Sequence, residues 1–515
     1  MDTTELSGLL KRLCKVAWAA NVTNPITYVT QISYLLFLKM LEEWDAQAEQ
    51  DARDLGRAHQ SLFEAIEVNG ETVDYEALRW SRFSSDPDNE RMLRTVRDLL
   101  PRLADHPGLS QGAQQIFTGA ALVIPDGASL RRMVDLVSPL SFVAQDADVK
   151  GDLFEILVDD LGSQKRAAQF RTPRHLIRVI TQMVDPGIGD TVCDPAAGTG
   201  GFLIAAHEHI RTANSSPEFI REVQRNGGQV IRRGLGDKLT PPQRRFLDSG
   251  TLHGFESDQD IIRMSGMNAV LHGFDQSPLI RRDSIAGSED RWDEVQFDVI
   301  LTNPPFSGEV DRNSVKRSLR VDTGTKYLLF LALCLRSLRP GGRCGIILPN
   351  GALFGDTGAH FELKRKLLDE FDLQAVVSLP VGMFQPYTGI PTAFLVFART
   401  NKPTESVWFY RVEGDGSSLK GQRKFGPQFR DDFPDLLTKW PARVEEPGRA
   451  WCVPARVIRD KGMNLTLSGL GLTEPEKVEH QPPEEILERV AEHEARIAQL
   501  VREMQALLEE GNGAQ

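Results

Sequence analysis

The stretch ILTNPPFSG, residues 300–308, places an amide side chain, two prolines and an aromatic ring directly after an apolar run. Two consecutive prolines remove two backbone donors and fix two φ angles, so they predict a rigid corner where a strand ends. Backbone carbonyls remain there as acceptors, while Asn303 adds an amide oxygen and Phe306 a flat ring face. Together these groups suit a planar substrate that carries an amino group. A β-turn before a loop, which Pro-Pro often marks, would explain the same residues without any chemistry.

A second candidate site is VCDPAAGTGGFLIAAHEHI, residues 192–210, where an apolar run, a carboxylate and small residues precede an amphipathic helix. Glycines let a ligand approach the backbone closely and leave N–H groups at the helix start free to meet a negative group. The spacing is not GxGxxG, and Asp194 would repel a pyrophosphate but attract an ammonium. The pattern therefore predicts a cofactor with an amino-acid moiety rather than NAD. The alternative is a glycine-rich turn that only packs.

Acidic residues follow two further strand-like runs. Glu256 lies in LHGFESD, residues 252–258, and Asp283 lies in LIRRDSIAG, residues 279–287. An acid at the end of the next strand is the usual partner of ribose hydroxyls in such sheets, which is the expectation for Glu256. Asp283 could accept a hydrogen bond from a purine amino group. Simple solvation of an acid after a strand is the alternative for both.

The elements that must position these residues lie between about residues 152 and 399, where short β-branched runs alternate with helical stretches. This alternation predicts an α/β fold with a doubly wound, mostly parallel sheet. Because ligands in such folds bind at the carboxyl ends of the strands, we expect the loops at 194–201 and 303–306 to share one edge. The strand candidates are DTVCDP, LHGFES, FDVILTNPP, GRCGIILP, LQAVVSLP and PTAFLVFA.

Four segments are predicted along the chain, at residues 1–145, 146–400, 401–475 and 476–515. In the first segment, apolar residues at steps of three and four from Leu6 to about Met133 predict a helical domain. This domain could cap the site or contact DNA, or it could only brace its neighbour. The third segment is rich in Gly, Pro and charge, which predicts a hairpin and surface loops.

The chain closes with a predicted helix that follows the linker TEPEKVEHQPPEE and stops at Gly511. Its apolar residues recur at alternating steps of four and three, which predicts a coiled-coil helix. A narrow apolar seam needs another helix to bury it, either in a partner or in the chain's own N-terminal bundle. The seam comprises Ile486, Val490, His493, Ile497, Leu500, Met504 and Leu507.

Composition limits the class of protein. The 515 residues exceed one compact core and predict roughly two or three units. The formal charge of −12 argues against holding a polyanion by general electrostatics, so a partner or a local patch would have to attract nucleic acid. The five cysteines show no CxxC pairing, which predicts no metal site and reduced thiols. With no apolar stretch long enough for a membrane span and no cleavable signal, we expect a cytoplasmic protein.

Three of these motifs carry a resemblance to a known family. DPAAGTGGFL, GFESD and FDVILTNPPF, in this order, resemble the motifs of S-adenosylmethionine-dependent methyltransferases that act on adenine N6 in DNA. Upstream, AAQFRTPRHL is similar to a cofactor-binding segment of that group, although Ala168 and Arg171 stand where the family usually has a glycine and aromatics. GGRCGIILPNGALFGD and LPVGMFQPYTGIPTAFLVF resemble segments of the modification subunits of type I restriction-modification systems. The resemblance covers nearly the whole chain.

The resemblance implies a Rossmann-like methyltransferase domain over residues 146–400 that binds S-adenosylmethionine. The catalytic corner is then Asn303, Pro304, Pro305 and Phe306. The Asn303 amide oxygen and the Pro304 carbonyl would accept the hydrogens of an adenine amine, and Phe306 would stack on the base. The implied cofactor-binding residues are Gln169, Phe170, Thr172, Pro173, Asp194, Ala196, Gly198, Thr199, Gly200, Gly201, Glu256 and Asp283.

The same resemblance implies a flipped adenine in DNA as the substrate, because the base must leave the duplex to reach the corner. It also implies three features of the assembly: a separate specificity subunit, a restriction subunit with translocase and endonuclease activity, and two copies of this chain per specificity subunit. Two other interpretations are a protein glutamine methyltransferase, which uses a similar Asn-Pro-Pro-aromatic corner, and a catalytically silent assembly scaffold. The intact Asn303 and Phe306 argue against the scaffold.

Overall fold

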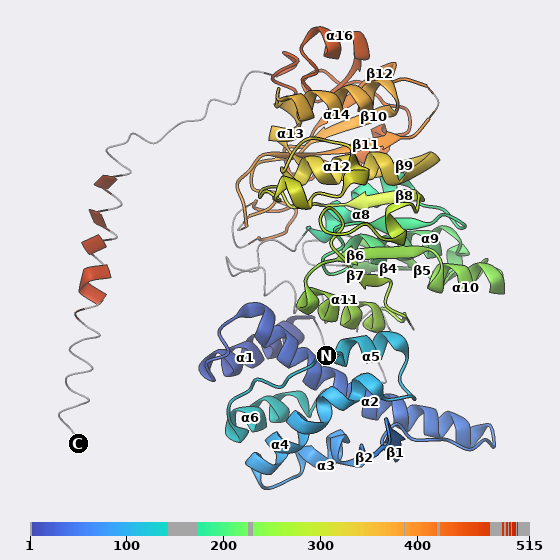
Figure 1. The fold of residues 1–515 in the computed structure, drawn as a ribbon, viewed down its shortest axis with the longest axis vertical. Coiled ribbons are helices and arrows are strands. Elements are labelled where there is room, and N and C mark those ends of the chain that lie inside the picture. The colour runs from blue at the N-terminus through green and yellow to red at the C-terminus, as the bar shows by residue number, and fades with distance from the viewer. Residues whose placement is uncertain are drawn as a thin grey trace. The chain divides into compact units, whose positions relative to one another are not determined.

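The computed structural model describes residues 3–142, 172–224, 230–274, 276–385, 387–400, 402–419 and 423–473, together with individual positions between 487 and 502. Contacts divide the chain into a large unit, Met1–Leu470, and a C-terminal unit, Gly471–Gln515. The large unit holds a group of N-terminal helices and a nine-stranded sheet (Figure 1). One extensive hydrophobic core lies among these helices, and another lies around the sheet. The α/β fold with an N-terminal helical region is therefore as predicted.

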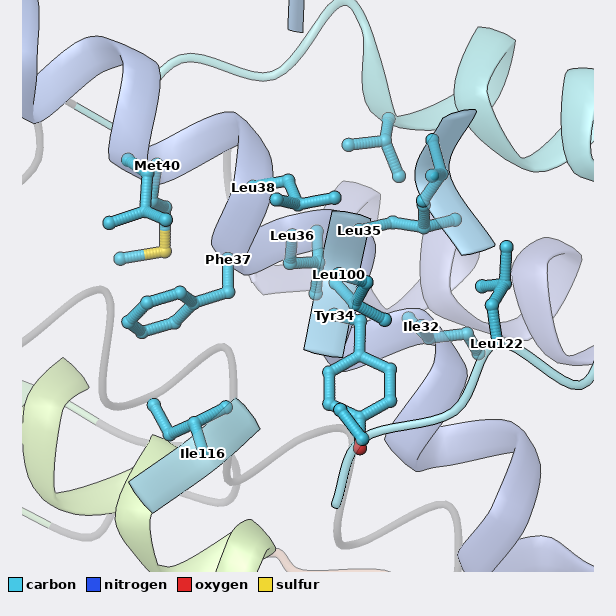
Figure 2. Packing of buried hydrophobic residues seen from close by; sticks show 14 of the residues in the cluster. Ile32, Tyr34, Leu35, Leu36, Phe37, Leu38, Met40, Leu100, Ile116 and Leu122 are labelled. Atoms are coloured by element: carbon cyan, nitrogen blue, oxygen red, sulfur yellow. The ribbon is translucent and has the colours of Figure 1, made fainter. Parts of the chain in front are cut away.

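The N-terminal core forms around the long helix α2. Asn24 caps this helix by accepting from the N–H of Ile26, and a proline in its first turn needs no donor there. Tyr34 and Phe37 of α2 lie among the buried residues of this core (Figure 2), and Phe37 meets Phe117 edge-on at 5.6 Å. The helices are α1 (Thr3–Ala19), α2 (Pro25–Asp54), α3 (Trp80–Ser84), α4 (Asn89–Leu99), α5 (Gln111–Phe117) and α6 (Gly127–Val137).

A β-hairpin interrupts this mainly helical region, and the helical pattern of the sequence did not predict it. Strand β1 (Ala65–Val68) pairs with β2 (Glu71–Asp74) through a two-residue turn of Asn69 and Gly70. Both turn residues have positive φ, 54° and 83°. The turn favours Asn-Gly for this reason, and the dipeptide is the sequence signal of such a hairpin. Helical periodicity on both sides concealed it.

The sheet is mostly parallel, and all six predicted strands are present. Its order is β13-β12-β10-β11-β9-β8-β3-β6-β7, with β9, β8, β3, β6 and β7 parallel to their neighbours within that run. Strands β12 and β13 come from residues beyond 400 and extend the same sheet, where the sequence predicted only a hairpin and loops. The strands are β3 (Val192–Asp194), β6 (Leu252–Glu256), β7 (Leu279–Arg281), β8 (Phe297–Thr302), β9 (Leu338–Pro349), β10 (Asp372–Ser378), β11 (Thr392–Ala398), β12 (Ser406–Arg411) and β13 (Ala450–Pro454).

Helices pack on the sheet in groups. Helix α8 packs against α9 and α15. Its buried residues share one hydrophobic core with Val192 and Leu301 of the strands. Helix α12 packs against α14 and β9. A second hairpin, β4 (Ile220–Gln224) and β5 (Val230–Gly234), follows α9. The helices are α8 (Arg174–Val184), α9 (Gly201–Ala213), α10 (Pro241–Ser249), α11 (Gln259–Leu271), α12 (Lys326–Ser337), α13 (Asn350–Phe354), α14 (Gly358–Asp369), α15 (Phe433–Lys439) and α16 (Ala455–Asp460).

Helix α11 connects the two cores. Its residues Ile261, Met264 and Met267 are buried in the N-terminal core, whereas Ile262 and Ala269 are buried in the sheet core. The helix packs directly on α5 and α2. The N-terminal helices are therefore held against an element of the α/β part.

The coiled-coil helix is only sparsely covered by the described residues. Leu487, Ile497 and Leu500 are helical and exposed. Of these three, Ile497 and Leu500 belong to the predicted seam. The remaining seam residues fall outside the described positions, so the seam stays a prediction: these are Ile486, Val490, His493, Met504 and Leu507.

None of the helices in the described ranges is both long and apolar enough to cross a membrane. All five cysteines are free thiols, and four of them are buried. Within the same ranges, no group of His, Cys, Asp and Glu side chains is arranged to hold a metal ion.

Candidate active site

Four parallel strands bring the predicted loops to one edge of the sheet. Strands β7, β6, β3 and β8 are adjacent and parallel, so their carboxyl ends lie side by side. Asp194 ends β3 and Glu256 ends β6, while Asn303 directly follows β8 and Asp283 lies two residues beyond β7. The expectation that residues 194–201 and 303–306 share one edge is confirmed.

A cavity of about 430 Å³ lies at this edge. Its wall is built from the loops after β3, β6, β7 and β8 together with the first turn of α8. This volume is in the range of small-molecule and cofactor sites. The wall includes the predicted residues Thr172, Asp194, Ala196, Gly198, Thr199, Gly201, Glu256, Asp283, Asn303 and Pro305.

The glycine loop between β3 and α9 is fixed by two residues from α11. Gly198 and Gly200 have positive φ, 52° and 80°, a conformation that favours glycine. Ser265 Oγ donates to the Gly198 carbonyl at 2.6 Å, and Asn268 Nδ2 donates to the Thr199 carbonyl at 2.8 Å. Sequence reasoning missed Ser265 and Asn268, because they follow the loop by 67 and 69 residues and carry no motif.

Asp194 is almost fully buried, with 1% of its surface exposed. Its Oδ1 accepts from the Thr302 hydroxyl at 2.7 Å and from the Ala196 N–H at 3.0 Å. Burial raises the pKa of Asp194 to about 7, although both hydrogen bonds oppose the rise. The carboxyl group therefore ties β3 to β8 as well as lining the cavity, and its charge responds to pH near neutrality.

Glu256 and Asp283 lie closer to the rim. Glu256 Oε1 accepts from the Asp258 N–H at 2.9 Å, and Asp283 Oδ1 accepts from the Ala286 N–H at 2.9 Å. Each bond holds the side chain against its own loop. In the described part of the chain the hydrogen bonds of both carboxylates use one oxygen, so the second can accept from a ligand hydroxyl or amino group.

A buried ion-pair cluster braces the wall beside Asp283. Arg282 Nε pairs with Asp290 at 2.7 Å, and its guanidinium lies 4.9 Å from the centre of the Phe255 ring. Lys316 Nζ, from the segment after the proline corner, pairs with Asp293 at 3.1 Å. The cluster links that segment to the loop after β7.

Asn303 is held by one end of its amide. Its Nδ2 donates to Thr172 Oγ1 at 2.8 Å. Its Oδ1 is buried, and no residue that the structure describes donates to it. Thr172 lies just before α8, and Pro173 is the N-cap residue of that helix. The amide nitrogen is thus engaged by the protein, whereas the acceptor oxygen is kept for another donor.

The remaining corner residues differ in exposure. Pro305 lines the cavity, whereas Pro304 is buried. Phe306 is partly buried and meets Phe384 edge-on, with ring centres 5.0 Å apart and planes at 80°. Sequence reasoning did not single out Phe384, although it lies in the quoted segment LPVGMFQPYTG. Gln169 and Phe170 lie outside the described residues.

The arrangement can therefore hold a small ligand that carries hydroxyl, amino or cationic groups against acidic side chains. It also has a buried amide acceptor, Asn303 Oδ1, on the same corner as Phe306, whose ring meets Phe384. These groups suit the alignment of an amine rather than its deprotonation, because the corner residues themselves are uncharged.

The family model for N-6 DNA Methylase matches residues 145–479, and the model for the HsdM N-terminal domain matches residues 7–137. The type I restriction enzyme EcoEI methylase subunit of Escherichia coli is 29% identical over 504 residues, which cover 95% of this chain and 94% of that protein.

Two solved structures have the same fold. A chain from a study of complex assembly and conformational transition of the type I R-M system aligns with a TM-score of 0.67 and 26% identity, over 98% of both chains. The type I restriction-modification system methyltransferase subunit from Streptococcus thermophilus aligns with a TM-score of 0.65 over 91% of this chain and 99% of that one, at 16% identity. The second likeness concerns the fold alone.

Proposed function

The chain belongs to the N-6 DNA methylase family, and from that membership we propose that it is the methylation subunit of a type I restriction-modification system. In this function it transfers a methyl group from S-adenosylmethionine to adenine N6 in DNA. The matched HsdM N-terminal domain and the methylase subunits among its relatives support this function. They do not favour a protein glutamine methyltransferase or a silent scaffold.

The observation that carries the proposal is the state of the Asn303 amide. Its Nδ2 is engaged by Thr172, while its buried Oδ1 lacks a donor among the described residues. A buried acceptor left without a partner costs about 1–3 kcal/mol. A substrate amino group that donates to this oxygen recovers that free energy, so the corner selects a ligand with an N–H donor.

The corner residues supply alignment. The lone pair of an adenine amine is delocalised into the ring, which makes the nitrogen a poor nucleophile. Asn303 Oδ1 and the Pro304 carbonyl accept its two hydrogens, favour a pyramidal nitrogen and direct the lone pair into the cavity. Two prolines fix the backbone between the acceptors, so their spacing is preset. Alignment of this kind is a large source of rate in transfer between two bound groups.

Two aromatic rings complete the corner. The edge-on pair of Phe306 and Phe384 offers a ring face and a ring edge to a planar base. A base inside a duplex cannot reach a corner at the edge of the sheet, so the adenine must be flipped out. In this proposal Phe306 stacks on the flipped base.

The cavity residues fit S-adenosylmethionine, which supplies the methyl group when bound. The open glycine loop permits close approach, Glu256 accepts from ribose hydroxyls, and Asp283 accepts from the purine amino group. Asp194 attracts the ammonium of the amino-acid end when ionised. The proposed cofactor-binding residues remain those of the sequence prediction, Gln169, Phe170, Thr172, Pro173, Asp194, Ala196, Gly198, Thr199, Gly200, Gly201, Glu256 and Asp283.

DNA recognition is assigned to a partner. A net charge of −12 is unsuited to non-specific phosphate binding, which supports a separate specificity subunit that reads the site in the cytoplasm. A restriction subunit and two copies of this chain per specificity subunit complete the proposed assembly.

The C-terminal helix binds a helix of the specificity subunit through its seam. Deleting residues 484–515 should therefore abolish co-purification with that subunit, while calorimetry still detects S-adenosylmethionine binding; normal assembly of the truncated chain would contradict the helix assignment.

The catalytic assignment is tested with Asn303→Ala in tritium-transfer assays on DNA and on protein. Loss of the acceptor should slow transfer to DNA by roughly 100- to 1000-fold, as for removal of one positioned transition-state hydrogen bond. Asn313→Ala is the matched control, because Asn313 is exposed in the same connecting segment. Near-normal DNA methylation by Asn303→Ala would refute the role of Asn303, and label transfer to protein instead of DNA would refute the substrate.

A further inference from the structure

Asp415 lies in the segment between β12 and α15, to which neither the sequence nor the proposed function gives a role. It has 0% exposure, and its carboxylate is fully supplied with donors. Oδ2 accepts from His175 Nε2 at 2.8 Å and from Arg423 Nη1 at 2.6 Å. Oδ1 accepts from the Ser417 hydroxyl at 2.6 Å. This buried group therefore joins two elements that are far apart in the sequence.

The first element leads to the amide of the catalytic corner. His175 is the second residue of α8, three residues after Thr172. Thr172 Oγ1 is the group that engages Asn303 Nδ2. Between them, Pro173 has a fixed φ of −54° and forms the start of the helix. The position of His175 therefore constrains where Thr172 holds the amide.

The second element leads to the aromatic ring of the corner. Arg423 uses its other nitrogen, Nη2, to donate to the carbonyls of Gly382 and Met383. The next residue in that loop is Phe384, whose ring meets Phe306 edge-on. Gly382 also lies close to Leu419, four residues after Asp415, because a Cβ at its position would meet the Leu419 carbonyl at 2.5 Å.

From these contacts we propose that Asp415 is a positioning residue for methyl transfer, which fixes Asn303 through His175 and Thr172 and fixes Phe306 through Arg423 and Phe384. The inference rests on the proposed function of the corner. In this proposal, the segment after β12 positions the residues that contact the target base. The amide and the ring must be correctly placed at the same time, and one carboxylate in contact with both supporting elements achieves this.

The charge of Asp415 is essential to this task. The His175 ring is enclosed by Phe425 and Phe433, with ring centres 5.5 and 5.6 Å away, so it cannot turn to another acceptor without displacing them. The Arg423 guanidinium needs an anion to remain beneath the loop that carries Phe384. An amide in place of the carboxylate keeps the shape but weakens both contacts, because hydrogen bonds to an ionised acceptor are about twice as strong.

A matched control exists elsewhere in the chain. Asp45 is a buried aspartate that accepts from a histidine, a serine and an arginine, with no described connection to the catalytic corner. The variants Asp415→Asn and Asp45→Asn therefore make the same chemical change in similar surroundings. A purely structural role would affect unfolding in both variants and leave the transfer step unchanged.

The experiment measures single-turnover methyl transfer by the full chain, assembled with its partner subunits, on duplex DNA that carries the site found by methylome sequencing. At saturating DNA and S-adenosylmethionine, Asp415→Asn should be slower by roughly 10- to 100-fold, the cost of a small misplacement of reacting groups. S-adenosylmethionine affinity should stay within about threefold, and Asp45→Asn within about twofold of the wild-type rate. A fluorescent 2-aminopurine at the target base should show an altered signal with Asp415→Asn alone.

Equal rates for the two variants would overturn the inference. If Asp415→Asn does not fold, Arg423→Lys decides the question, since a lysine retains the charge but cannot reach Asp415 and both carbonyls at once. A normal rate for Arg423→Lys would also overturn it. Failure of the proposed function is distinguishable, because the wild-type assembly would then transfer no methyl group to DNA or Asn303→Ala would remain active.

Discussion

Two buried aspartates, one in the N-terminal helices and one beside the sheet, have almost the same set of donors. Each carboxylate accepts from a histidine Nε2, a serine hydroxyl, an arginine and a backbone N–H. The pKa of both is lowered, because these donors and the arginine charge outweigh the opposing effect of burial. The two sets are Asp45 with His59, Ser61, Leu62 and Arg79, and Asp415 with His175, Ser417 and Arg423.

The difference lies in what the two carboxylates connect. The donors of Asp45 lie 14 to 34 residues away in the chain and tie the C-terminal half of α2 to the loop before β1 and to Arg79, the N-cap residue of α3. His175 lies 240 residues from Asp415, in the first turn of α8, whose residues Arg174 and Ile177 line the cavity. The same kind of carboxylate cluster therefore stabilises the N-terminal helices at Asp45. At Asp415 it joins elements that hold a candidate active site. The chemistry of a buried charge does not by itself reveal its function.

The largest expected difference between the two aspartates is in the free energy of unfolding when each is replaced. Asp415→Ala should lower the free energy of unfolding by about 3–5 kcal/mol, because it leaves the charge of Arg423 buried without an anion. Asp45→Ala should cost less, about 1–3 kcal/mol, since the partner side chains there keep more solvent. Side-chain exposure is 24% for Arg79 and 19% for His59, against 15% for Arg423 and 9% for His175. Urea unfolding measures both variants, and an equal or reversed order would contradict the argument.

A third buried aspartate, Asp194, should affect stability with the opposite pH dependence. Among the residues that the structure describes it pairs with no cation, and burial raises its pKa to about 7. Between its unfolded pKa of about 4 and the folded pKa, the folded protein holds a proton that the unfolded chain releases. Stability from this residue therefore falls as pH rises through that window. For Asp45 and Asp415, whose pKa is lowered, the stability is present above the unfolded pKa and is lost as pH falls.

The affinity for a cationic cofactor should depend on the ionisation of Asp194. An ionised Asp194 attracts an ammonium, so affinity for S-adenosylmethionine should weaken by about fivefold between pH 7 and pH 6. Calorimetry in buffers of different ionisation enthalpy should detect proton release on binding near pH 7. Asp194→Asn is the control, because it cannot ionise. The same pH profile in the wild type and in this variant would show that another group is responsible.

Part of this site could be predicted from sequence, because the signals are local. Asp194, Glu256 and Asn303 each follow an apolar run, and the alternation of strands and helices placed their loops on one edge. Ser265, Asn268 and Asp415 gave no such signal, since they act through contacts with residues distant in the chain. The bond from Asn303 to Thr172 spans 131 residues, so neither motif could indicate it, although both residues were singled out.

Strands β12 and β13 were missed for a related reason. Their segment is rich in glycine, proline and charge, which predicts loops when it is considered alone. Strand β12 pairs with β10, and its Trp408 and Tyr410 are buried in the core around the sheet, so both the pairing and the burial depend on the tertiary fold. The Asn69-Gly70 hairpin differs, because its dipeptide was a readable local signal that the surrounding helical periodicity outweighed.

The smallest expected effect tests the path from Asp415 to the amide. Thr172→Val keeps the shape of the side chain but removes the Oγ1 that engages Asn303 Nδ2 at 2.8 Å. Loss of one neutral hydrogen bond, about 1 kcal/mol, should slow single-turnover transfer by roughly fivefold. If the Asp415 carboxylate acts on the Asn303 amide through Thr172, the effects of Thr172→Val and Asp415→Asn overlap. The double variant should then be less slow than the product of the two single effects predicts. Asp45→Asn combined with Thr172→Val should instead leave the Thr172→Val rate unchanged. Fully multiplicative effects of Asp415→Asn and Thr172→Val would show that Asp415 reaches the corner only through Phe384.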